Sequence, residues 1–134
     1  HTDEKTFSRL IGEGFMKIGK HLDEAGEIMS DIPYAEYPAY GSMDADNIHM
    51  IIGCYTAVPV PGKGEIKSID IPMRKVAVCL YKGNYEEQAA LYNEMEQWAK
   101  DMGYEASGKS IEHYYTGPDV PEDEQVTRVV MPLK

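Results

Sequence analysis

The feature that most constrains the fold is a change of hydrophobic period within residues 75–115. Residues 75–81 alternate along an apolar, partly β-branched run, which predicts a strand that ends in a turn at Gly83. The next segment has the 3.6-residue period of an amphipathic helix and stops at Gly103, and a further strand is predicted over residues 109–116. Asn84 and Glu87 are placed to form a capping box at the start of this helix. The apolar stripe of the helix is Leu91, Tyr92, Met95, Trp98, Ala99 and Met102.

The first half of the chain predicts a similar set of elements. Residues 34–40 are rich in aromatic side chains and interrupted by Pro38, which predicts a short or bent edge strand. Residues 48–58 predict a second strand, residues 65–71 alternate in polarity, and residues 125–133 predict the last strand. A helix from Thr6 to about Glu27 is predicted by a stripe at Phe7, Ile11, Phe15, Ile18, Leu22 and Ala25.

An internal repeat relates the two halves. The similar segments are 21–26 and 98–103, then 40–44 and 115–119, and then the strands 48–52 and 126–130. They predict an α+β fold built from two strand–helix–strand–strand units, about residues 6–58 and 65–134 of a single domain.

The sheet is expected to be antiparallel, with both helices on one side, because each helix has a single apolar stripe. The first unit lacks its opening strand, since its helix begins almost at His1. We therefore expect an open sheet edge at residues 75–81 or nearby. Proteins rarely leave such an edge bare, so a second copy in a homodimer, another partner or an upstream segment should cover it.

The net charge of the chain limits the kinds of ligand that it is expected to bind. The formal net charge of −10 over 134 residues repels phosphate backbones, so direct nucleic-acid binding is not expected, whereas cationic small molecules are attracted. No apolar run is long enough to cross a membrane, and no signal-peptide pattern is present. The two cysteines lie in apolar strand-like runs, as thiols of a reducing compartment do. These features predict a cytoplasmic protein without a membrane partner.

Glu112 is the residue with the clearest functional potential. It alternates with Ile111 and His113, so it shares a sheet face with Tyr114. From the residues alone, a solvent-exposed strand carboxylate is the simpler interpretation. The alternative is a carboxylate among aromatic rings that pairs with a flat cation or acts as a general base. No phosphate loop, nucleophile triad or metal-ligand spacing occurs, so no metal or cofactor is expected.

The order of these motifs resembles the GyrI-like effector-binding family, the drug-sensing domain of MerR- and AraC-type multidrug regulators, with a SOUL-like fold. The segments that carry the resemblance are Ile71-Pro72, Val76–Tyr81, the Lys82–Tyr85 turn, the helix with Trp98, Gly103, Ile111–Tyr114 and Val129–Pro132. The resemblance implies two halves related by a pseudo-twofold axis, with ligands held in a cleft between them.

The resemblance implies a module that binds amphipathic, cationic aromatic molecules, for toxin sequestration or effector sensing. A DNA-binding or other protein partner is compatible with it but is not indicated by the residues. The candidate ligand contacts are Glu112, Trp98, Tyr37, Tyr55, Tyr114 and Tyr40. The alternative is a hydrolase of strained, cyclopropanoid-type electrophiles, with Glu112 as general base and Tyr114 assisting; burial would suit Glu112 to this role by raising its pKa.

Overall fold

A computed structural model of the chain describes residues 6–29, 32–42, 47–69, 71, 73–83, 88–116 and 119–134. The elements in chain order are α1 (Phe7–Ala25), β1 (Tyr34–Tyr37), β2 (Ile51–Gly53), β3 (Val76–Lys82), α2 (Gln88–Asp101), β4 (Ser110–Tyr114) and β5 (Val126–Pro132), with short 3-10 turns at Tyr40–Ser42 and Glu122–Glu124. The predicted capping box at Asn84 and Glu87 lies outside the described residues. Within the described residues, neither helix combines the length and the apolar character needed to cross a membrane.

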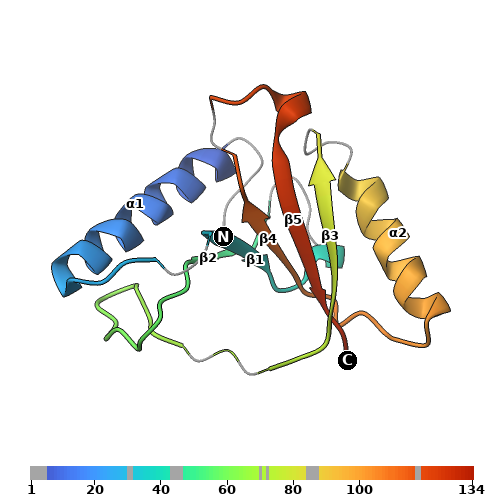
Figure 1. Cartoon of the computed structure of the whole chain (residues 1–134), viewed down its shortest axis with the longest axis horizontal. Helices are drawn as coiled ribbons and strands as arrows, with labels where there is room; N and C mark the ends of the chain where they lie inside the picture. Colours follow the sequence, from blue (N-terminus) through green and yellow to red (C-terminus); the bar gives the residue numbers. More distant parts are fainter. Residues whose placement is uncertain are drawn as a thin grey trace.

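The five strands form one antiparallel sheet in the order β2-β1-β4-β5-β3. The predicted α+β class is confirmed, and Figure 1 shows the two helices flanking the strands at opposite ends. One detail of the prediction was wrong: β1 is an interior strand rather than an edge strand, because it pairs with both β2 and β4. Pro38 lies just after the last residue of β1, so its missing N–H does not interrupt the pairing.

The strand order reflects the two halves of the chain. β1 and β4 are neighbours in the middle of the sheet, β2 lies beside β1, and β5 lies beside β4. Each central strand follows a helix in the chain, α1 or α2. β3 has no counterpart in the first half among the described residues. β2 and β3 are therefore the outermost strands, and a partner that covers either edge stays a prediction.

The two faces of the sheet differ sharply. Both helices cover the face that carries Glu112: Gly14 of α1 lies against Ile52, and Tyr92 of α2 contacts Ser110. The side chains of Val76, Val78 and Leu80 point to the opposite face and are exposed. Under α2 lies the larger core cluster, formed by Ala77, Met95, Val129 and Met131.

One predicted strand was too long, and another was not formed at its described positions. The apolar run 48–58 forms a strand only at Ile51–Gly53. Residues 65–71 form no strand among their described positions, although Ile66 makes a single bridge to Lys63. The apolar content of residues 48–58 and the alternation of residues 65–71 were misleading because a strand also needs a neighbouring strand to pair with.

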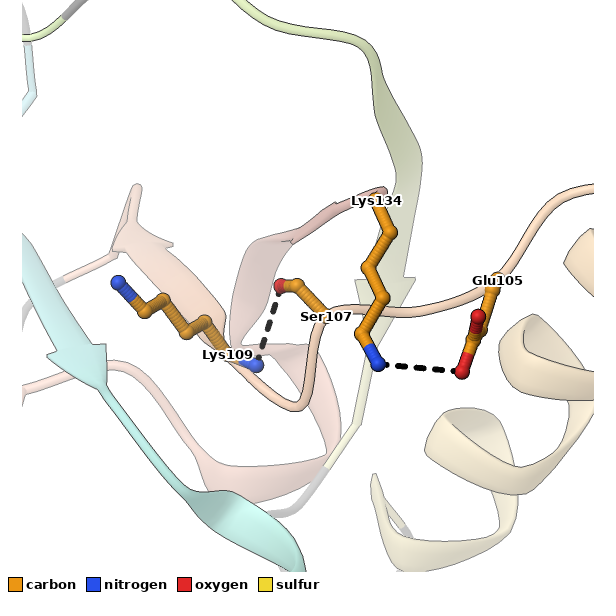
Figure 2. Close-up of polar contacts among 4 residues, drawn as sticks. All are labelled: Glu105, Ser107, Lys109 and Lys134. Atoms are coloured by element: carbon orange, nitrogen blue, oxygen red, sulfur yellow. Dashed lines mark hydrogen bonds and ion pairs between the residues drawn. The ribbon is translucent and has the colours of Figure 1, made fainter.

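The end of the chain fixes the connection between α2 and β4. Gly103 ends the helix region with a φ of 83°, a left-handed conformation that favours glycine, as predicted. Beyond it, the Ser107 N–H donates to the Pro132 carbonyl over 3.0 Å and the Lys134 N–H to the Glu105 carbonyl over 2.8 Å. Figure 2 shows the Lys134 ammonium paired with the Glu105 carboxylate at 3.1 Å. These contacts fix residues 105–107, which lead into β4, the strand that carries Glu112.

Candidate functional site

A cleft with a volume of about 1320 Å³ lies between the two helices, above the central strands. One wall comes from α1 and the other from α2, and residues 115–116, 119–122 and 125 contribute a rim. The floor carries Tyr37 of β1 together with Glu112 and Tyr114 of β4. The two helices lie at opposite ends of the sheet (Figure 1), and the cleft between them lies over its middle strands.

Glu112 lies on this floor because of strand alternation and register. Its cross-strand neighbours are Ala35 on β1 and Val129 on β5, both fully buried. The short alanine leaves room beside the carboxylate. Glu112 itself is only 7% exposed, which excludes the interpretation as a solvent-exposed strand acid.

Tyrosine hydroxyls satisfy the carboxylate. Tyr92 donates to one Glu112 oxygen, and Tyr114 donates to the other over 3.1 Å. The Tyr37 hydroxyl lies 3.1 Å from that of Tyr114, and the Ser110 hydroxyl lies 3.0 Å from that of Tyr92. A phenol has one proton, so with both phenol protons on Glu112, Tyr37 and Ser110 act as donors in these outer bonds. Two phenols thus donate directly to the carboxylate, and two further hydroxyl groups donate to those phenols.

The carboxylate has no cationic neighbour among the described residues of the cleft lining. Burial raises the pKa of Glu112, and the hydrogen bonds from Tyr92 and Tyr114 oppose that shift. Burial, followed by the Glu112 charge, raises the pKa of Tyr92, which keeps this phenol protonated. Among the described residues that line the cleft, none is Lys, Arg or His.

A second tyrosine–glutamate pair lies on the α2 wall. The Tyr40 hydroxyl donates to Glu96, and burial together with this bond raises the pKa of Tyr40. The Tyr40 ring meets the Tyr92 ring edge to face, with centroids 5.0 Å apart. Tyr40 was a candidate from the sequence, and the structure brings it into the same cleft as Glu112, Tyr37 and Tyr114.

Two candidate residues lie elsewhere, and their placement corrects the sequence prediction. Trp98 is 52% exposed and does not line the cleft, because it is six residues beyond Tyr92 and therefore about 120° away from it around the helix. The Tyr55 ring stacks on His113 with centroids 5.8 Å apart, and its hydroxyl lies 3.2 Å from the His113 Nε2. His113 follows Glu112 in the strand, so Tyr55 lies on the opposite face of the sheet.

Sequence reasoning missed the α2 residues that face the cleft. Tyr92 was assigned to the apolar stripe, and Gln88 and Glu96 were not considered. The three are spaced four residues apart and therefore share one face of the helix, next to the buried stripe. This four-residue spacing could have indicated a cleft-facing side of the helix. It becomes informative only when Glu112 is known to lie opposite that side.

The fold and the cleft define a class: an α+β domain whose two halves enclose a pocket suited to a small molecule. The chain belongs to the family of GyrI-like small molecule binding domains, which matches residues 2–134. Its expected family is thereby confirmed.

Solved structures agree on the fold. The C-terminal domain of EcmrR matches with a TM-score of 0.81 and 20% sequence identity, over 99% of this chain and 85% of that chain. A second match is the cryo-EM structure of the EcmrR–DNA complex in EcmrR-RPo, with the same TM-score of 0.81 and the same 20% identity. In that comparison this chain covers 50% of the EcmrR chain. A sequence comparison with curated proteins found no match.

Proposed function

We propose that the cleft binds amphipathic, cationic aromatic molecules and that Glu112 is the counter-charge for the bound cation. One observation carries the proposal: a buried carboxylate, held by two phenol donors, has no cationic side chain beside it among the described lining residues. A buried charge is costly unless it is paired, so a cationic ligand would supply the missing partner.

The surroundings favour an aromatic cation over a simple inorganic one. The rings of Tyr37, Tyr40 and Tyr92 border the cleft and offer faces and edges to a flat ligand. Glu96 adds a second negative group on the same wall. The overall charge of −10 attracts cations toward the protein.

The biological use that we propose is effector sensing or toxin sequestration. EcmrR, whose C-terminal domain has this fold, has been solved in complex with DNA. By analogy, a DNA-binding partner or domain would convert ligand capture into regulation. This domain itself is not expected to contact DNA, because its net charge of −10 repels phosphate backbones.

The proposal is tested with a charged ligand and its neutral counterpart. We expect 4-benzyl-1-methylpyridinium to bind about tenfold or more tightly than 4-benzylpyridine at a mildly alkaline pH, where the latter is uncharged. A partly desolvated ion pair of about 1–3 kcal/mol gives a difference of this size. Isothermal titration calorimetry measures both dissociation constants. Equal affinities, or no binding of the cation, would contradict the proposal.

A second candidate function, hydrolysis of a strained electrophile, is favoured by the raised pKa of Glu112. A carboxyl group with a pKa nearer neutrality is a better general base. Glu112 would take a proton from water as the water oxygen bonds to a cyclopropane carbon and a ring C–C bond breaks. The Tyr114 hydroxyl would give its proton to the released carbon, or to the oxygen conjugated with it, and would regain a proton from Glu112 along their hydrogen bond. If this function holds, incubation with a cyclopropane-bearing electrophile will consume the compound, and Glu112→Gln will abolish the loss. Mass spectrometry of the recovered compound checks this, and an intact compound would exclude turnover.

A further inference from the structure

One polar group on the cleft wall has no role in the Glu112 network. Gln88 is the first residue of α2, lines the cleft and is 6% exposed. Its Nε2 is buried and makes no hydrogen bond within the described part of the chain. Buried amide donors are nearly always paired in folded proteins, so an unpaired one in a ligand cleft indicates a group that the ligand satisfies.

The neighbouring donors are already engaged. The hydroxyl protons of Tyr92 and Tyr114 point to the Glu112 carboxylate. Gln88 precedes Tyr92 by four residues, so both side chains project from the same face of α2. A ligand whose cationic end reaches Glu112 therefore passes the Gln88 amide on the same wall.

We propose that Gln88 is a specificity-determining residue that selects cationic ligands carrying a neutral hydrogen-bond acceptor, such as a ketone or amide carbonyl. The inference rests on the proposed function, because it describes ligands of the same cleft. The amide nitrogen donates to the carbonyl oxygen, while Glu112 pairs with the cationic ring. A ligand without an acceptor leaves the Gln88 donor unpaired and binds less tightly.

The test uses two permanent cations that differ at one position. 4-Benzoyl-1-methylpyridinium has a carbonyl where 4-benzyl-1-methylpyridinium has a methylene. Calorimetry is expected to show that the wild type prefers the ketone by about three- to tenfold, the range for one hydrogen bond. Gln88→Leu removes the amide donor and should reduce the preference for the ketone to about twofold or less. The remaining preference would come from the effect of the carbonyl group on the charge of the pyridinium ring.

The matched control is Gln97→Leu, because Gln97 is an exposed glutamine of the same helix outside the cleft and bonds to Asp101. This variant should keep the full preference. Gln88→Met is the second variant if the leucine form does not fold. In ¹⁵N-labelled wild type, the Gln88 side-chain amide resonances should shift with the ketone and much less with the methylene compound.

The possible outcomes distinguish the role of Gln88 from the proposed function of the cleft. Equal affinity of the wild type for both compounds, or a preference retained in the Gln88 variants, would overturn the role of Gln88 and leave the proposed function intact. If neither cation binds, the proposed function is refuted, and the role of Gln88 is refuted together with it.

Discussion

Replacing Glu112 with glutamine is expected to weaken binding of 4-benzyl-1-methylpyridinium about tenfold or more. Glutamine keeps the side-chain shape and removes the charge, so the loss measures the charge pair, which contributes about 1–3 kcal/mol when partly desolvated. Because the carboxylate is 7% exposed, solvent and salt screen it far less than a surface acid. Calorimetry with both proteins measures the change.

The matched control is Glu94→Gln, which removes the same charge from an exposed position of α2 outside the cleft. Screening should limit its effect to about twofold. If the two variants bind equally well, the location of the charge is irrelevant and ring stacking alone holds the ligand. The Glu112 variant should fold normally, because one of the two phenols, Tyr92 or Tyr114, can still donate to the amide oxygen, and the other can rotate its hydroxyl to accept a hydrogen bond from the amide NH2.

The same carboxylate should make binding and stability depend on pH. Its pKa is higher in the folded chain than in the unfolded chain, so folding takes up a proton between these two values. The free energy of unfolding contributed by Glu112 is therefore largest below the unfolded-state pKa and falls as pH rises through the folded-state pKa. Affinity for a permanent cation changes in the opposite direction, rising with pH as Glu112 ionises. Glu112→Gln should remove both dependences.

Replacing Met131 with alanine is expected to lower the free energy of unfolding by about 2–5 kcal/mol, because truncation of a buried side chain removes apolar burial and leaves a cavity. Met131 is fully buried on β5, within the cluster under α2 that contains Ala77 and Met95. Urea denaturation followed by circular dichroism measures the change. Since natural domains are stable by only about 5–15 kcal/mol, the variant should lose a large share of its stability.

Met73→Ala is the control for this substitution, because the Met73 side chain is fully exposed. Its effect should stay within about 0.5 kcal/mol. The Tyr40 hydroxyl lies 4.0 Å from the Met131 sulfur, so Met131→Ala should also loosen the α2 wall and reduce ligand affinity. A Met131 variant as stable as the Met73 variant would contradict the assigned core.

The sequence by itself determined the class of the fold, and the family resemblance that it carries singled out Glu112 as a candidate ligand contact. The 3.6-residue period placed both helices to within a few residues, the glycine at 103 ended α2, and alternation put Glu112 and Tyr114 on one sheet face. These properties are local, because a helix stripe, a helix stop and a strand alternation each depend on residues a few positions apart. The order of the motifs over residues 71–132 then indicated the family, which the comparison confirmed.

Only the tertiary structure decided which aromatic side chains surround Glu112. Trp98 and Tyr92 both belonged to the predicted apolar stripe of α2, yet Tyr92 contacts the carboxylate and Trp98 is half exposed. Tyr37 and Tyr55 were both candidates, but the fold placed them on opposite faces of the sheet. Helix rotation and strand register depend on how distant segments pack, and a single-residue change in register moves a side chain to the other face. For that reason the sequence could identify the carboxylate but could not identify the partners that bury it.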